Sequence, residues 1–192
     1  MRAGALTLGL VLMSSPARAA DKQIRPMLGF TFGGSTTLLD LEKAADEKHV
    51  VAGVSGVWLG DIFGLDVDLA HVPRFFESNN RLVLSSSVTT VTGNIVLALP
   101  RRLTEYSLRP YVVGGAGVMH ASSTDAFGVL QVGASLAAFD FGAGATGFVT
   151  KRIGLCWEVR RFQGVRREDR VVDFGPKELS FWRASMGLAI RY

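Results

Sequence analysis

A histidine and a serine stand two residues apart in this chain, at His120 and Ser122. A serine hydroxyl becomes a nucleophile when a neighbouring base takes its proton, and histidine is a common base. The pair is therefore a candidate for acyl-transfer chemistry. An acid to orient the histidine is less evident, because no Glu lies between His120 and Lys151 and the local acids are Asp125 and Asp140. A rim histidine beside loop serines is the alternative interpretation, and we expect no catalytic residue.

The other residues that often carry chemistry predict neither a metal site nor a cofactor. His49, His71 and His120 show no recognised spacing of metal ligands. Cys156 is the single cysteine, so no internal disulfide can form. Its position on an inferred inner face favours an inert thiol.

Six charged residues alternate with apolar residues, which places them on one face of a strand. Three are acids and three are bases, so their charges balance. Charges inside a protein must be paired, and this set therefore predicts an ion-paired interior rather than a channel for ions of one sign. We call the set the lumen charge network; it consists of Asp66, Asp68, Glu158, Arg160, Arg183 and Arg191.

Eight segments position these residues, and each alternates apolar and polar residues with the period of two that is typical of a β-strand. The segments span residues 24–35, 50–59, 62–72, 83–99, 108–120, 136–149, 153–162 and 180–192. Short connections (60–61, 100–107 and 150–152) alternate with longer, mostly polar ones (36–49, 73–82, 121–135 and 163–179). Transmembrane barrels combine an even number of antiparallel strands with short turns at one end and long loops at the other. The pattern predicts an all-β fold, an eight-stranded antiparallel up-and-down transmembrane β-barrel.

The first residues are typical of an export signal. A positive charge at Arg2 precedes an apolar run over 3–13, and Ala17-Arg18-Ala19 offers a small-x-small cleavage site. We expect residues 1–19 to be a cleavable signal peptide and residues 20–192 to form the barrel domain. Without this segment, 19 basic residues face 17 acidic ones. Because the arginines are also scattered along the chain, we expect no nucleic-acid partner.

Three segments resemble the porin-family outer membrane β-barrel domain: FGLDVDL at 63–69 running into VPRFFE at 72–77, VTGNIVLALP at 91–100, and LRPYVVGGAG at 108–117. The resemblance implies an eight-stranded barrel of the OmpA/OmpX type in the bacterial outer membrane, as a monomer surrounded by outer membrane lipids. An interior this narrow is filled by its own side chains, so we expect no wide pore.

The last strand resembles the closing strand of such barrels, which has the form polar-x-Gly-x-x-aromatic-x-aromatic. Ser185, Gly187 and Tyr192 match this form, and Ile190 stands where the first aromatic would be. The resemblance implies that these residues are an assembly signal read by the barrel assembly machinery, with periplasmic chaperones as further partners.

Aromatic residues near the inferred strand ends predict an interfacial belt. The expected members are Trp58, Tyr106, Tyr111, Phe148, Trp157, Trp182 and Tyr192.

Three functions remain open at this stage. The leading one is a non-enzymatic barrel that contributes to envelope integrity or to surface interaction through its external loops. The second is a lipid A-modifying enzyme, since His120 and Ser122 resemble the His-x-Ser pair of an outer-membrane lipid A deacylase; Ser123 departs from the asparagine expected next. The third is a soluble periplasmic lipocalin-like carrier of an apolar ligand, which requires the two faces of the strands to be reversed. The apolar segment 126–132 has no assigned role.

Overall fold

The computed structural model describes residues 21–36, 48–75, 83–104, 108–125, 131–166 and 177–192. The expected signal peptide, residues 1–19, lies outside this part of the chain. The elements are β1 (Asp21–Thr36), β2 (His49–Leu59), β3 (Phe63–Pro73), β4 (Val83–Ala98), a short 3₁₀ turn η1 (Arg101–Leu103), β5 (Leu108–Asp125), β6 (Gln131–Phe148), β7 (Ile153–Arg166) and β8 (Lys177–Arg191). In the described part of the chain, η1 is the one helical element, and it is too short to cross a bilayer.

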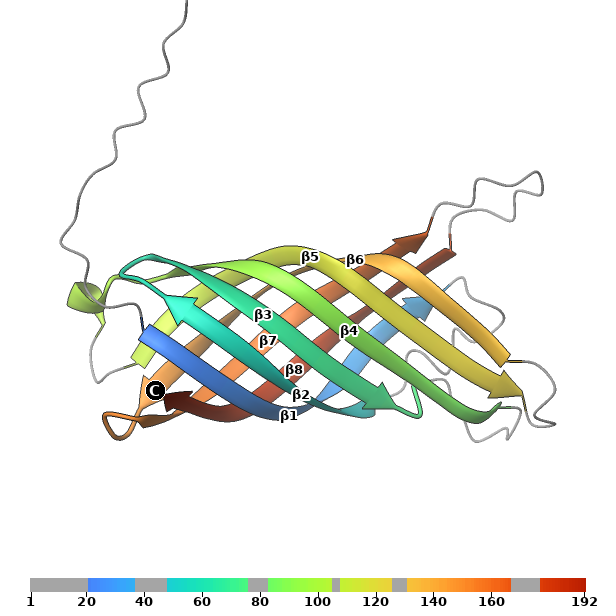
Figure 1. The fold of residues 1–192 in the computed structure, drawn as a ribbon, viewed down its shortest axis with the longest axis horizontal. Coiled ribbons are helices and arrows are strands. Elements are labelled where there is room, and N and C mark those ends of the chain that lie inside the picture. The colour runs from blue at the N-terminus through green and yellow to red at the C-terminus, as the bar shows by residue number, and fades with distance from the viewer. Residues whose placement is uncertain (1–20, 37–47, 76–82, 105–107, 126–130, 167–176) are drawn as a thin grey trace, which may run out of the picture.

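Each strand pairs antiparallel with the next, and β1 pairs with β8, so the sheet closes into a barrel. The start of β1 and the end of β8 lie together at one end of the barrel, beside η1 (Figure 1). We call this the turn end and the opposite end the loop end. Closure satisfies the backbone hydrogen bonds of every strand without leaving a sheet edge. The predicted eight-stranded antiparallel up-and-down barrel is confirmed.

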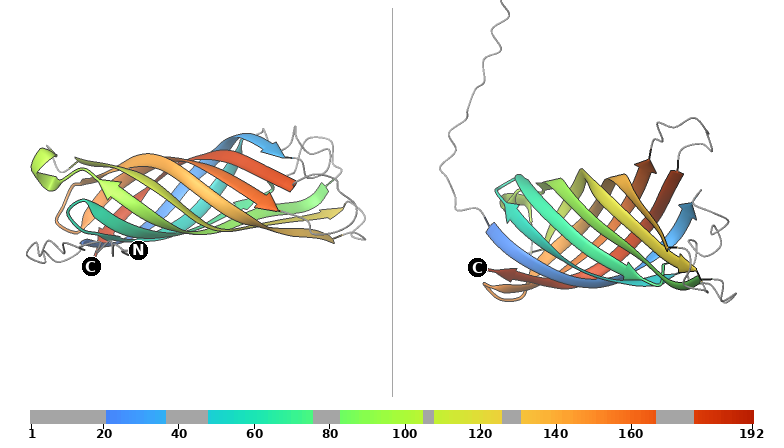
Figure 2. Two further views of the ribbon diagram at one scale, coloured as in Figure 1. Left: turned by 90° about the horizontal axis from the view of Figure 1, so that it is seen from above. Right: turned by 45° about the vertical axis from the view of Figure 1, so that its right-hand side comes forward.

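Four strands, β5, β6, β7 and β8, run several residues further toward the loop end than predicted. Figure 2 shows β5 and β6 reaching beyond their neighbours. β5 continues to Asp125 and β6 begins at Gln131, with the register continuing through Ser122↔Gly133 to Thr124↔Gln131. The alternation of apolar and polar side chains is lost in this region. The backbone hydrogen bonds between β5 and β6 continue there, because they do not depend on side-chain polarity. Residues 131 and 132 of the apolar segment therefore belong to β6, and residues 126–130 lie outside the described chain.

The two faces of the sheet have opposite character along the middle of most strands. On β3, Leu65 is 60% exposed on the outside, whereas Asp66 is 2% exposed on the inside. The outward residues are large and apolar, among them Leu28, Val67, Ile95, Phe141, Trp157 and Leu188. The polar and charged residues are buried in the lumen.

The interior is filled at its loop end by apolar side chains. The cluster there includes Val72, Met119, Leu136, Phe162 and Phe181, and the ring centroids of the two phenylalanines stack 5.3 Å apart. The charged residues lie nearer the middle of the barrel, so the loop-end half of the lumen is packed like an ordinary protein core.

Two glycines allow the strands to approach one another closely around the lumen. A Cβ atom on Gly142 would lie 2.2 Å from the carbonyl oxygen of Val159 and 2.8 Å from Cγ of Arg160. A Cβ atom on Gly117 would lie 1.9 Å from the carbonyl oxygen of Val91. Any larger residue would have to move a strand, so glycine is required at both positions.

Candidate functional site: a charged cluster inside the barrel

Arg160 on β7 is the centre of the charged cluster. Its guanidinium is 2.6 Å from the Asp66 carboxylate on β3, 3.1 Å from that of Asp140 on β6, and 2.5 Å from that of Glu158 on its own strand. The side chain is 2% exposed. Because β3 and β7 lie across the barrel from one another in the closed strand order, the Asp66–Arg160 pair bridges the lumen.

Arg183 on β8 makes a second bridge to β3. Its Nη1 and Nη2 donate to the two carboxylate oxygens of Asp68 at 2.8 Å and 2.9 Å, the paired geometry that favours arginine. Nη2 also lies 3.6 Å from Oε1 of Glu158. The guanidinium carbon stands 4.7 Å from the centroid of the Phe162 ring, where the charged layer meets the apolar one.

The structure adds members that sequence reasoning missed. Tyr111 donates to Oε2 of Glu158 at 2.9 Å, and Nη1 of Arg25 donates to the Tyr111 hydroxyl at 3.2 Å. Asn94 donates to Oδ2 of Asp66 at 3.1 Å. Asp140, one of the two acids near His120 in the sequence, contacts Arg160 in the cluster. Its position between two outward phenylalanines would have identified it as a lumen residue.

Tyr111 was wrongly assigned to the interfacial belt, since its side chain is buried in the lumen. Trp58, Trp157 and Tyr192 are exposed on the outer surface, as the belt requires. Phe148 was also assigned to the belt wrongly, since it lines a cavity at the turn end and packs against Arg191. Tyr106 lies outside the described residues.

Arg191 lies apart from the other five residues of the lumen charge network. Its Nε donates to Oδ1 of Asp21 at 2.7 Å, and its guanidinium carbon stands 3.4 Å from the centroid of the Phe148 ring. Both contacts are at the turn end. The structure therefore brings Asp66, Asp68, Glu158, Arg160 and Arg183 together and leaves Arg191 elsewhere.

The charges inside the cluster nearly balance. Within the described chain, Arg160 and Arg183 contact the four carboxylates of Asp66, Asp68, Asp140 and Glu158, and Arg25 is linked to Glu158 through the Tyr111 hydroxyl. Oδ1 of Asp66 and Oδ1 of Asp140 have no hydrogen-bond partner in this part of the molecule. The arrangement holds strands together across the lumen. Cys156 is buried close to it, as the inner-face assignment predicted.

The candidate catalytic pair is not assembled as a base and nucleophile. Nδ1 of His120 lies 3.0 Å from Oγ of Ser135 on β6, and Oγ of Ser122 lies 3.0 Å from Oγ of Ser87 on β4. The histidine and the serine therefore hydrogen-bond to residues on opposite neighbouring strands.

The three histidines do not converge. The side chain of His49 is buried, with its ring 5.2 Å from that of Phe75, whereas His71 is exposed and lies 2.9 Å from Oγ1 of Thr89 through Nδ1. Across the described residues, no group of three His, Cys, Asp or Glu side chains is placed to hold a metal ion.

A row of outward polar residues crosses four strands just beyond the apolar band. The register pairs His71 with Thr89, Thr89 with His120, and His120 with Ser135. Two residues nearer the turn end, the outward positions on β3 and β4 are Leu69 and Val91. We call His71, Thr89, His120 and Ser135 the polar row. On these strands it marks the limit of the apolar surface toward the loop end.

The residues of the expected assembly signal lie on both faces of β8. Ser185 is buried on the inner face, and Gly187 lies against β1, where a Cβ atom would be 2.3 Å from the carbonyl oxygen of Pro26. Ile190 and Tyr192 are exposed on the outside. Recognition by an assembly machinery is a separate question and stays a prediction.

The fold is that of an OmpA/OmpX-type eight-stranded outer membrane barrel. Solved structures with this architecture include Neisserial surface protein A (NspA), at a TM-score of 0.67 and 12% identity over 90% of this chain and 97% of that one. OprG from Pseudomonas aeruginosa aligns at a TM-score of 0.54 and 13% identity over 91% and 96% of the two chains. Ail of Yersinia pestis aligns at 0.51 and 15% identity over 89% and 99%.

No family model and no curated protein matches the sequence. At these identities the structural likeness defines the fold, and function has to be argued from the residues of this chain.

Proposed function

We propose that the protein is a non-enzymatic outer-membrane barrel that contributes to envelope integrity or to surface interaction through its external loops. One observation carries the proposal: large apolar side chains cover the outside of the closed sheet, and the charged cluster around Arg160 is buried within it. Such a surface is unfavourable in water and suited to hydrocarbon. The membrane lipids would then be its first partners.

The same observation argues against a lipocalin-like carrier. That function needs Asp66, Asp68 and Arg160 on the outside and Phe63 and Leu65 within. The three charged residues are buried, and Phe63 and Leu65 are both exposed. A soluble carrier with this arrangement would expose its apolar face to water.

The orientation follows from the two kinds of connection. Barrels of this class place short turns in the periplasm and long loops outside. We therefore assign the turn end, where β1 begins and β8 ends, to the periplasm. The polar row at His71, Thr89, His120 and Ser135 then lies at the outer boundary of the hydrocarbon.

A closed lumen is part of this proposal. The bridges Asp66–Arg160 and Asp68–Arg183 cross the interior, and Phe162 and Phe181 fill it on the loop-end side. We propose that the barrel does not serve as a diffusion pore. Reconstituted protein should give no steady conductance in a planar bilayer, and a stable ohmic current from the purified wild type would contradict this part of the proposal.

Assembly would use the terminal strand. We propose that Ser185, Gly187, Ile190 and Tyr192 are read by the barrel assembly machinery after delivery by periplasmic chaperones, and that the barrel is a monomer. The support is the pattern of these residues and their place on the strand that closes the barrel against β1.

Spin labels at two outward positions test the placement in the membrane. A nitroxide at position 188 should be highly accessible to oxygen and poorly accessible to a water-soluble nickel chelate in reconstituted bilayers, because Leu188 lies in the apolar band. A nitroxide at position 120 is the matched control, since His120 lies in the polar row and should be accessible to the chelate. Low accessibility of position 188 to both reagents would indicate a protein core, and the proposal would fail.

A further inference from the structure

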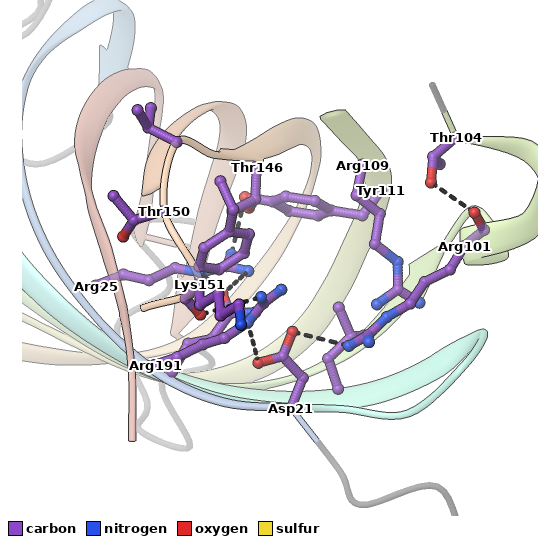
Figure 3. Close-up of a pocket in the computed structure, with 14 residues that line it drawn as sticks. Asp21, Arg25, Arg101, Thr104, Arg109, Tyr111, Thr146, Thr150, Lys151 and Arg191 are labelled. Carbon is purple, nitrogen blue, oxygen red and sulfur yellow. Dashed lines mark hydrogen bonds and ion pairs between the residues drawn. The ribbon is translucent and has the colours of Figure 1, made fainter. Parts of the chain in front are cut away.

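A cavity of about 620 Å³ opens at the turn end of the barrel, and we call it the vestibule. Its wall is formed by the ends of β1, β2, β5, β6 and β8, by η1 and by the turn between β6 and β7 (Figure 3). A volume of this size is typical of sites that bind small organic molecules. The vestibule borders the charged cluster around Arg160, with which it shares Arg25 and Tyr111, and it lies at the opposite end of the barrel from the polar row.

The described residues that line the vestibule carry an excess of positive charge. One of them is acidic, Asp21. Five are basic: Arg25, Arg101, Arg109, Lys151 and Arg191. In Figure 3, Arg101 and Arg109 lie on one side of Asp21, and Arg25, Lys151 and Arg191 lie on the other.

Asp21 is shared by two of these cations. Its Oδ1 accepts from Nε of Arg191 at 2.7 Å, and its Oδ2 accepts from Nη2 of Arg101 at 3.0 Å. One carboxylate therefore neutralises only part of the positive charge of the two guanidinium groups. The Phe148 ring against Arg191 holds that guanidinium in place on the wall.

Arg25 and Arg109 hydrogen-bond to neutral acceptors. Arg25 donates to the side-chain oxygen of Gln23 at 2.9 Å and 2.8 Å and to the Tyr111 hydroxyl at 3.2 Å. Arg109 donates to the backbone oxygens of Leu99, Gly60 and Asp61 at 3.0, 3.0 and 2.6 Å. These contacts fix the position of both guanidinium groups without neutralising them.

Arg109 also retains a donor. The side chain is buried, with the residue 8% exposed, and its Nη1 has no hydrogen-bond partner within the described chain. A buried donor without an acceptor is unfavourable, and most for a charged group. Arg109 therefore brings a fixed and incompletely satisfied positive charge to the wall of a basic cavity, an environment that attracts an oxyanion.

We propose that the vestibule binds an organic anion that carries at least two phosphate or carboxylate groups. One anionic group is held on the side of Arg101 and Arg109, and the other on the side of Arg25, Lys151 and Arg191. Guanidinium groups bind phosphate and carboxylate oxygens through two parallel hydrogen bonds, which gives selectivity for this chemistry over a simple halide. Two sources share it: a free small anion and the headgroup of a diphosphate lipid.

Calorimetric titration with inorganic pyrophosphate tests the site on the purified full barrel in neutral detergent at low ionic strength. Pyrophosphate should bind at one site and more tightly than phosphate. Arg109→Met should weaken binding about tenfold, the effect of one charge-assisted hydrogen bond. Lys151→Met should weaken it as well, and because Lys151 is exposed on a turn, this variant keeps the test valid if Arg109→Met fails to fold.

Two neighbours supply matched controls. Arg102→Met and Arg152→Met each remove an exposed arginine adjacent to a vestibule residue, and both should leave binding unchanged. Absence of pyrophosphate binding, or equal binding by all four variants and the wild type, would overturn the proposal.

A second titration distinguishes the two sources. A short-chain cardiolipin carries two phosphate groups and stays soluble in the same detergent. Binding that depends on Arg109 and is tighter than that of pyrophosphate supports a lipid headgroup, and weaker binding supports a free anion.

Discussion

Arg160 and Arg161 are adjacent residues of β7, and their side chains lie on opposite faces of the barrel wall. Replacing each arginine in turn by methionine compares the loss of a buried cation with the loss of a peripheral one. Arg160 is in contact with three carboxylates in the lumen. Arg161 is partly exposed on the outside, 5.5 Å from the Trp182 ring, and donates to Oγ of Ser180 at 3.1 Å. Methionine keeps much of the length of each side chain and removes its charge.

The expected magnitudes differ clearly. Two unit charges about 4 Å apart attract by about 4 kcal/mol at an effective dielectric constant of about 20, and removing one partner of a buried pair destabilises proteins by about 3–5 kcal/mol. The three contacts of Arg160 share one cation and are not additive, so Arg160→Met should lower the free energy of unfolding by about 3–5 kcal/mol. Arg161→Met should lower it by about 1 kcal/mol or less, the range of a partly exposed cation–π contact.

Urea titrations of the barrel in phospholipid vesicles, followed by tryptophan fluorescence, measure both values. Asp66→Asn provides a test of coupling. In the wild type it should destabilise, because Arg160 loses a carboxylate. In the Arg160→Met background it should stabilise, because it removes a buried negative charge that has lost its cation. Equal losses for the two methionine variants, or destabilisation by Asp66→Asn in both backgrounds, would refute the ion-paired lumen.

Four further predictions concern other parts of the barrel. Leu65→Arg places a charge in the apolar band and should lower the free energy of unfolding in bilayers by about 2–4 kcal/mol, whereas Leu65→Met should change it little; a tolerated arginine would show that this face is not in lipid. Gly142→Leu should reduce the fraction of barrel that resists unfolding on an unboiled gel, because its Cβ atom would lie 2.2 Å from a carbonyl oxygen. Gly93→Ala, with no atom within 4 Å of the added carbon, is the matched control, and equal folding of both would contradict the close approach of β6 and β7. His120→Ala should leave the number of acyl chains on lipid A unchanged by mass spectrometry; a change that depends on His120 would favour an enzyme. Deletion of Tyr192 should lower assembly in cells more than refolding in detergent, and equal losses in both would argue against an assembly signal.

Local pattern was enough to predict the class of fold and the two faces of most strands. Alternation with a period of two is a property of neighbouring residues, and in a closed barrel one parity must face lipid and the other the lumen. Asp66 and Leu65 were therefore assigned to the correct sides. The same rule applied to β6 would have found Asp140 between Phe139 and Phe141. The rule does not assign a face to Tyr111, because Val112 and Val113 are both apolar and the segment therefore does not alternate. The pairing of Tyr111 with Ala98 and Gly144 decides its face instead.

Which charges meet was decided by the closed sheet. Asp66 and Arg160 are 94 residues apart, and Asp21 and Arg191 are 170 residues apart. No local pattern relates them; the register around the barrel determines which lumen residues share a level. That register places Arg160 at the centre of the charged cluster and moves Arg191 to the turn end. There the closure of β1 on β8 and the position of η1 create a basic vestibule from residues that are unremarkable in sequence. The sequence alone thus determined an inside-out barrel, because lipid and lumen impose opposite preferences on adjacent residues. The cross-lumen bridges and the vestibule arise only when distant strands are brought to the same level by closure.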